Sequence, residues 1–236
     1  MNATLFVTAL RQRFTSPIRL VLVAAVFAFP LMFMLFFPQI GLHAVQSGTL
    51  YAFLLGAGLI GQETSSGVMQ LLFARPVRRW EYVTSRWLAI AAAIAGLVAA
   101  QIALASLILL ARGAAPDLAD VLFSFGDQVL PALATLSVLV LFSSLISGIG
   151  DVAAIILSFI SGQVLQAMGQ FTRHESVTRA GQEIIRFVAP QISLEAVHGL
   201  DSVPWFEWVS YLSTISLCLA VAVLLINARE ISYASE

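Results

Sequence analysis

Few side chains in this chain of 236 residues are of the kinds that carry catalysis or hold a metal. The single cysteine, Cys218, lies within an apolar run, which excludes a disulfide or a thiolate metal cage within one chain. The three histidines are scattered, and no His-Glu-x-x-His motif occurs. The apolar segments contain neither paired catalytic carboxylates nor a nucleophile elbow. The sequence therefore predicts that the chain itself is not an enzyme.

Three glycines, Gly56, Gly58 and Gly61, spell the pattern Gly-x-Gly-x-x-Gly. In dinucleotide-binding proteins this pattern follows a strand and opens a helix. Residues 51–60 instead predict an apolar helix, so close packing of small residues is the favoured interpretation over a nucleotide site. The phosphate-binding motif Gly-x-x-x-x-Gly-Lys-Ser/Thr is absent from the sequence. Any use of ATP would therefore require another polypeptide.

The composition is that of a membrane protein. Hydrophobic residues make up 59% of the chain and charged residues only 11%, with a mean hydropathy of +0.93. A soluble domain carries about a quarter charged residues, because its surface faces water. All basic residues are arginines that flank apolar runs, so the basic patch of a nucleic-acid-binding protein is missing. We expect an all-α integral membrane protein, since a helix satisfies its own backbone groups in lipid.

Six segments are apolar enough to be considered as membrane-spanning helices. They are Ile18–Phe37, Gly48–Gly61, Tyr82–Ala111, Val129–Ile149, Val152–Met168 and Trp208–Asn227. The second is short, so it either extends back through His43 or lies in a thin, protein-lined part of the fold. Eight arginines fall on the side of the N-terminus and four on the other side. The positive-inside rule therefore predicts that both termini are cytoplasmic.

We predict one transmembrane domain that covers residues 1–236 and contains three segments outside the spans. Residues 1–17 predict an amphipathic stretch on the inner surface. Residues 62–81 form a cytoplasmic connection, and residues 169–207 form an external segment of short helices before the last span. Asp151, in the tight turn between the fourth and fifth spans, is expected to cap the fifth helix rather than relay protons.

The cytoplasmic connection has the pattern of a short helix followed by the wet end of a span. Ser65 or Ser66 can cap the helix, and the residue before Pro76 should end it. Three arginines are expected to mark the wet end of the third span: Arg78, Arg79 and Arg86. A helix with an apolar face and charged edges fits a groove of a cytoplasmic partner.

Glu63, at the inner end of the second span, is the carboxylate most expected to have a role. A charge there is costly to bury unless it is paired. We expect the partner to be one of three arginines: Arg75, Arg78 or Arg79. The alternative is a solvated helix end.

The connection resembles the signature of ABC-2 type transporter permeases. In that signature an acidic residue, a small-residue pair, a Leu-Leu step and an Arg-Pro-Val-x-Arg element follow the second span. The matching residues are Glu63, Ser66, Gly67, Leu71, Leu72, Arg75, Pro76, Val77 and Arg79. The six-span layout and the external helices also fit, so the resemblance covers nearly the whole chain. The sequence departs from the family at Thr64, Ser65 and Val68.

This resemblance implies a fold like that of type V ABC exporters and a permease subunit that moves a substrate, with export favoured, across the bacterial plasma (inner) membrane. The partners implied are a separate ATP-binding subunit, which holds ATP and Mg, and a second permease, identical or related. The ATP-binding subunit would dock on the coupling residues Glu63, Ser66, Gly67, Gln70, Leu71, Leu72, Arg75, Pro76, Arg78, Arg79 and Glu81. The Arg-Pro-Val-x-Arg form also resembles the branch described as permeases for multi-copper enzyme maturation, although no cluster of copper ligands occurs.

Polar side chains of the fifth span could line a pathway: Ser158, Ser161, Gln163 and Gln166. Close helix packing through Ala154, Ser158 and Gly162 is the more favoured meaning of this region. Two other classes of function are weighed, a secondary carrier and an intramembrane enzyme. A carrier is expected to have matched halves and midplane charges, which are not evident, and an enzyme needs a catalytic motif.

Overall fold

A computed structural model describes residues 3–37, 41–42, 45–66, 69, 78–190, 192, 194 and 205–233. Helices make up nearly all of this part of the chain, and no strand occurs within it. The helices are α1 (Ala3–Phe14), α2 (Pro17–Phe36), α3 (Gly48–Gly56), α4 (Gly61–Ser65), α6 (Arg79–Ala111), α7 (Leu118–Leu145), α8 (Gly150–Thr172), α9 (Glu175–Val188) and α11 (Trp205–Tyr233). The predicted all-α class is confirmed.

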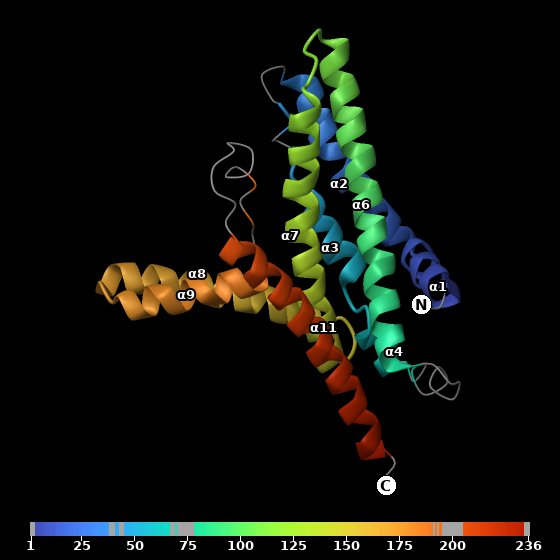
Figure 1. The fold of residues 1–236 in the computed structure, drawn as a ribbon, viewed down its shortest axis with the longest axis vertical. Helices are drawn as coiled ribbons and strands as arrows, with labels where there is room; N and C mark the ends of the chain where they lie inside the picture. The colour runs from blue at the N-terminus through green and yellow to red at the C-terminus, as the bar shows by residue number, and fades with distance from the viewer. Residues whose placement is uncertain are drawn as a thin grey trace.

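Two long helices, α6 and α7, form the middle of the molecule and run side by side (Figure 1). α7 is the central element, because it contacts α3, α6, α8 and α11. α1 packs against the lower part of α6, and α2 contacts both α3 and α6 (Figure 1). The N-terminus, α4 and the end of α11 lie in the lower half of the view, whereas the connection from α6 to α7 lies at the top (Figure 1).

Five helices in the described part of the chain are long and apolar enough to cross a membrane: α2, α6, α7, α8 and α11. About 20 residues are needed for a span, and α3 has 9. The predicted second span, Gly48–Gly61, is therefore wrong as a continuous helix. It breaks after Gly56, and the turn 57–60 leads into α4. Gly58 makes this break possible, because its φ of +64° is a conformation that residues with a Cβ rarely adopt.

The predicted limits of the fourth span were too narrow at its N-terminal end. α7 begins at Leu118, eleven residues before the predicted start at Val129, and Pro131 lies inside it. Polar residues such as Ser124 and Gln128 are buried in the bundle. They lower the hydropathy of this stretch, so hydropathy alone does not predict that the helix begins here. Because α7 is surrounded by other helices, these polar groups lie against protein rather than against lipid.

α8 and α9 form a closely packed hairpin that projects to one side, across the direction of α6 and α7 (Figure 1). Small residues allow the close contact. A Cβ at Gly162 would lie 2.8 Å from a side-chain carbon of Ile185, and a Cβ at Gly181 would lie 2.6 Å from the carbonyl oxygen of Gly162. Close packing through Gly162 is confirmed. A helix before the last span is also present, as α9, while residues 195–204 of the predicted external segment lie outside the described residues.

Candidate functional site

The candidate site lies at the end of the bundle where α3, α4 and α6 meet. Among the predicted coupling residues, the structure describes Glu63, Ser66, Arg78, Arg79 and Glu81. The other six lie outside the described residues: Gly67, Gln70, Leu71, Leu72, Arg75 and Pro76. Ser66 and Arg78 are exposed, whereas Glu63 is buried. The residues that flank positions 67–77 are therefore exposed to solvent, whereas Glu63 of α4 is buried in the bundle.

Glu63 forms a buried ion pair with Arg86, which lies two turns into α6. The side chains of Arg86 and Glu63 are 4% and 5% exposed, and the Tyr82 hydroxyl donates a second hydrogen bond to the carboxylate. The Arg86 guanidinium also lies over the Tyr82 ring, 5.3 Å from its centroid, and donates to Gln12 Oε1 of α1 at 2.9 Å. Such a pair lowers the free-energy cost of burying the two charges, because both ions retain hydrogen-bond partners.

The observed partner of Glu63, Arg86, was not among the arginines named for it, of which Arg75 lies outside the described residues. Arg86 was expected at the wet end of α6, and its burial corrects this too. Arg78 is exposed, and Arg79 donates to Asn227 Oδ1 at 2.8 Å, which links α6 to the end of α11. Helical periodicity explains the difference. Tyr82 and Arg86 are four residues apart, so both point to the same side of α6, toward α4.

Arg13 holds the break between α3 and α4 from the side of α1. Its guanidinium donates to the carbonyl oxygens of Ala57 at 2.7 Å and Gly58 at 3.1 Å. The end of α3 thus gains donors for carbonyl groups that a helix terminus leaves unpaired. Arg13 is 2% exposed, and its burial, with the neighbouring charges of Arg19 and Arg86, lowers its pKa to about 10. It remains charged at neutral pH, so the break sits against a fixed buried cation.

Two side chains hold the same break from the opposite side. The Asp151 carboxylate, fully buried, accepts a hydrogen bond from the Gly58 amide at 2.7 Å. Ser143 Oγ accepts from the amides of Ile60 and Gly61 at 3.0 and 2.9 Å, so a residue of α7 caps the start of α4. Asp151 also accepts from the amide of the next residue at 2.9 Å. The expected capping role was therefore incomplete, since its main partner lies 93 residues away.

The turn between α7 and α8 is joined to α4 through backbone alone. The Gly148 amide donates to the Gly61 carbonyl oxygen at 2.8 Å. A Cβ at Gly61 would lie 2.5 Å from the carbonyl oxygen of Gly148 and 2.6 Å from that of Ile146. Only a glycine fits there. The predicted close packing of the glycine pattern is thus confirmed at Gly61, although the role of Gly58 is a turn.

We call the connected set of Arg13, Glu63, Arg86, Ser143 and Asp151, with the break that they surround, the α4 node. It joins α4 to α1, α6, α7 and α8. Sequence reasoning singled out Glu63 but missed the contacts of the other four members. A signal was present for the charged ones, because each lies close to an apolar run where an unpaired charge is costly.

The residues predicted to line a pathway all lie on α8. Ser161 and Gln163 are exposed, while Ser158 and Gln166 are half-buried. The hydroxyls of the two serines donate back to their own helix, to the carbonyl oxygens of Ala154 and Ser158, both at 2.8 Å. Their role in a pathway stays a prediction.

Comparison with known proteins places the whole bundle in one family. A family model described as ABC-2 family transporter protein matches residues 11–228, which include every member of the α4 node. No curated protein and no solved structure matches the chain. Because the matched region covers most of the sequence, the multi-pass helical chain belongs to the ABC-2 family of transporter proteins.

Proposed function

We propose that this chain is the permease subunit of an ABC transporter and that residues 62–81 couple it to a separate ATP-binding subunit. The family match supports the permease role. The observation that carries the coupling role is the α4 node, because the exposed residues Ser65 and Ser66 lie at the end of α4, which the node joins to four other helices. A displacement of this segment would therefore act on the bundle rather than on one helix.

The partner subunit would bind ATP and Mg and push on the segment as it changes its own state. A second permease copy, or a related chain, would complete the pathway. With both termini and α4 in the cytoplasm, the connection from α6 to α7 is external, and the membrane is the bacterial inner membrane. Export is the favoured direction. Alternation between inward-open and outward-open states then follows from rigid-body movement, driven from the α4 node.

Labelling of engineered cysteines tests the orientation. Native Cys218 is 1% exposed, so the wild-type chain gives a low background. Ser66→Cys should react with a membrane-impermeant maleimide in inside-out vesicles and not in intact cells. Ala115→Cys, in the exposed connection from α6 to α7, should show the reverse. Labelling of Ser66→Cys in intact cells would place the segment outside and contradict the proposal, since no cytoplasmic ATPase could reach it.

Copurification tests the coupling surface itself. The chain would be co-expressed with a candidate ABC ATP-binding subunit, and the complex would be purified through a tag on the permease. Arg78→Glu reverses an exposed charge at the start of α6 and should lower the yield of the ATPase roughly tenfold, about 1.4 kcal/mol of binding free energy. Arg173→Glu is the matched control and should leave the yield unchanged. Equal yields from both variants would count against docking at residues 62–81.

A further inference from the structure

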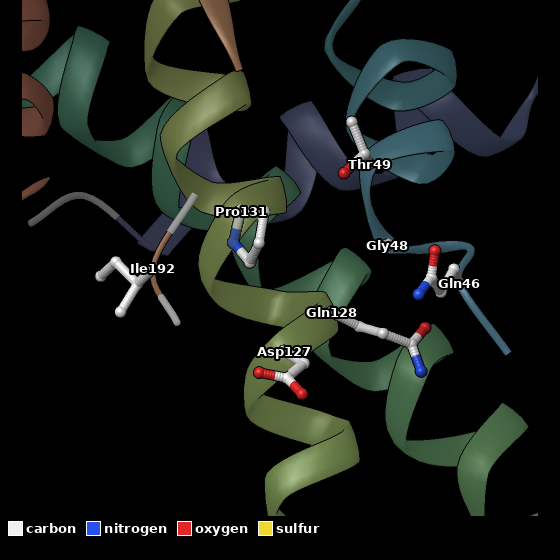
Figure 2. A pocket seen from close by; sticks show the side chains of 7 residues that line it. All are labelled: Gln46, Gly48, Thr49, Asp127, Gln128, Pro131 and Ile192. Atoms are coloured by element: carbon white, nitrogen blue, oxygen red, sulfur yellow. The ribbon is translucent and has the colours of Figure 1, made fainter. Parts of the chain in front are cut away.

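A polar cavity lies between the start of α3 and the N-terminal half of α7 (Figure 2). Its volume is about 400 Å³. The lining residues are Gln46, Gly48, Thr49, Asp127, Gln128, Pro131 and Ile192. None of them belongs to the α4 node, so this cavity is separate from the site described above.

Gln128 gives the cavity an unused hydrogen-bond donor. Its side chain reaches from α7 toward Gln46 and the start of α3 (Figure 2), and the residue is 6% exposed. Oε1 accepts from the Ser47 amide at 3.3 Å, whereas Nε2 has no partner. The positions of Oε1 and Nε2 cannot be exchanged, because the Ser47 N–H is a donor and needs an acceptor opposite it. A buried donor without a partner is unusual and calls for a ligand atom.

The start of α3 adds further donors beside Gln128. Ser47 occupies the N-cap position but makes no side-chain cap, because its hydroxyl donates to Gln101 Oε1 of α6. The amides of the first helical turn, at Gly48 and Thr49, therefore lack the usual side-chain acceptor. Helix N-termini also favour negative charge through the helix dipole. This part of the cavity suits a phosphate group.

The same cavity carries a negative charge on its rim. Among the lining residues that the structure describes, Asp127 is the charged one, and its side chain is exposed. A carboxylate next to a phosphate site disfavours a purely anionic ligand and favours one that also carries an ammonium group. The lining therefore fits a zwitterionic group with a phosphate and a primary amine.

An apolar groove of about 590 Å³ adjoins the cavity at Gln46, which lines both. It runs between α2 and α3 along Ala25, Phe29 and Phe33. Ala25 and Phe33 are eight residues apart, which is about 12 Å along a helix axis. That length is close to the depth of one leaflet of a hydrocarbon core of about 30 Å. An acyl chain attached to the head group would therefore lie in this groove.

We propose that the polar cavity and the adjoining groove bind one molecule of an aminophospholipid, with its phosphate at Gln128 and the start of α3, its ammonium at Asp127, and an acyl chain along α2. Location in the outer leaflet depends on the proposed orientation of the chain. Binding itself does not depend on the coupling role of residues 62–81.

Native mass spectrometry of the full-length chain tests this proposal. Delipidated protein in mild detergent would be incubated with phosphatidylethanolamine or phosphatidylglycerol at equal concentration. One molecule of phosphatidylethanolamine should be retained. Its affinity, calculated from the fraction of protein that carries the lipid, should be roughly tenfold higher than that of phosphatidylglycerol, a difference of about 1.4 kcal/mol. Gln128→Glu keeps an acceptor for Ser47 but removes the donor, and should weaken retention by a similar factor. Gln163→Glu, on the exposed face of α8, should not.

A second pair of variants addresses the groove and keeps the proposal testable if Gln128→Glu does not fold. Ala25→Trp would fill the groove, and Ala24→Trp is its control, because both residues are exposed but only Ala25 lines the groove. Equal retention by these two variants would refute acyl-chain binding. Displacement of the lipid by soluble O-phosphoethanolamine at the same concentration would overturn a membrane lipid as the ligand. Equal binding of both phospholipids would overturn the choice of head group.

Discussion

Replacement of Gly61 by Ala is the sharpest test of the α4 node. The added Cβ would lie 2.5 Å from the carbonyl oxygen of Gly148 and 2.6 Å from that of Ile146. Both are backbone atoms of the turn between α7 and α8, so no flexible side chain can move aside. A carbon and an oxygen need about 3.3 Å or more between them. α4 must therefore move away from the turn by roughly 1 Å.

That movement has a calculable cost. It would break the hydrogen bond from the Gly148 amide to the Gly61 carbonyl oxygen, 2.8 Å long, which leaves a buried acceptor unpaired at about 1–3 kcal/mol. Overpacking adds about 1–3 kcal/mol, while the higher helix propensity of Ala returns about 0.5–1 kcal/mol. At the middle of these ranges, the expected net loss of stability is about 3 kcal/mol. For chains of this length that corresponds to a lowering of Tm by roughly 5–15 °C.

Thermal unfolding of the purified chain in detergent, followed by tryptophan fluorescence, measures this change. Gly96→Ala is the matched control, because a Cβ at Gly96 in α6 would have no heavy atom within 4 Å. The control should leave Tm unchanged or raise it slightly. The reasoning is refuted if Gly61→Ala unfolds within about 2 °C of the Gly96→Ala protein, less than about 1 kcal/mol of stability.

Two further substitutions address the ion pair and the α8–α9 hairpin. Arg86→Met should destabilise the chain by about 3–5 kcal/mol, because it leaves the buried carboxylate of Glu63 without its cation, and the double variant with Glu63→Gln should recover part of that loss in the same unfolding assay. Equal Tm values for the single and double variants would show that the pair is not coupled. Gly181→Leu should separate α9 from α8, since its Cβ would lie 2.6 Å from the Gly162 carbonyl oxygen, and tryptic cleavage at exposed Arg179 should become faster. Cleavage at the wild-type rate would contradict this packing.

Composition and periodicity were enough to predict the class of the protein and most of its long helices. Hydropathy identified α2, α6, α8 and α11 because their lipid-facing sides are continuously apolar. It failed at the N-terminal end of α7, where buried polar residues such as Ser124 and Gln128 replace apolar ones. Hydropathy measures preference for lipid, and a helix enclosed by other helices does not need that preference.

The contacts of the α4 node could not be predicted for a different reason. Local rules place Tyr82 and Arg86 on one side of a helix, but they do not say which distant group lies opposite. Arg13 meets Gly58 across 45 residues, and Asp151 meets it across 93. The glycine pattern was a usable signal, since Gly58 allows a turn where a continuous helix was expected.

The way the α4 node is built bears on how force could pass through the bundle. An unbroken helix at this place would satisfy its own backbone groups and would need no other element. The break instead exposes carbonyl and amide groups, which are satisfied by Arg13 of α1, Ser143 of α7 and Asp151 of α8. Because buried polar groups are costly to leave unpaired, these helices must follow α4 when it moves or the bonds must exchange together. A break in the helix thus makes a two-state response of several helices more favourable than a gradual bend of one.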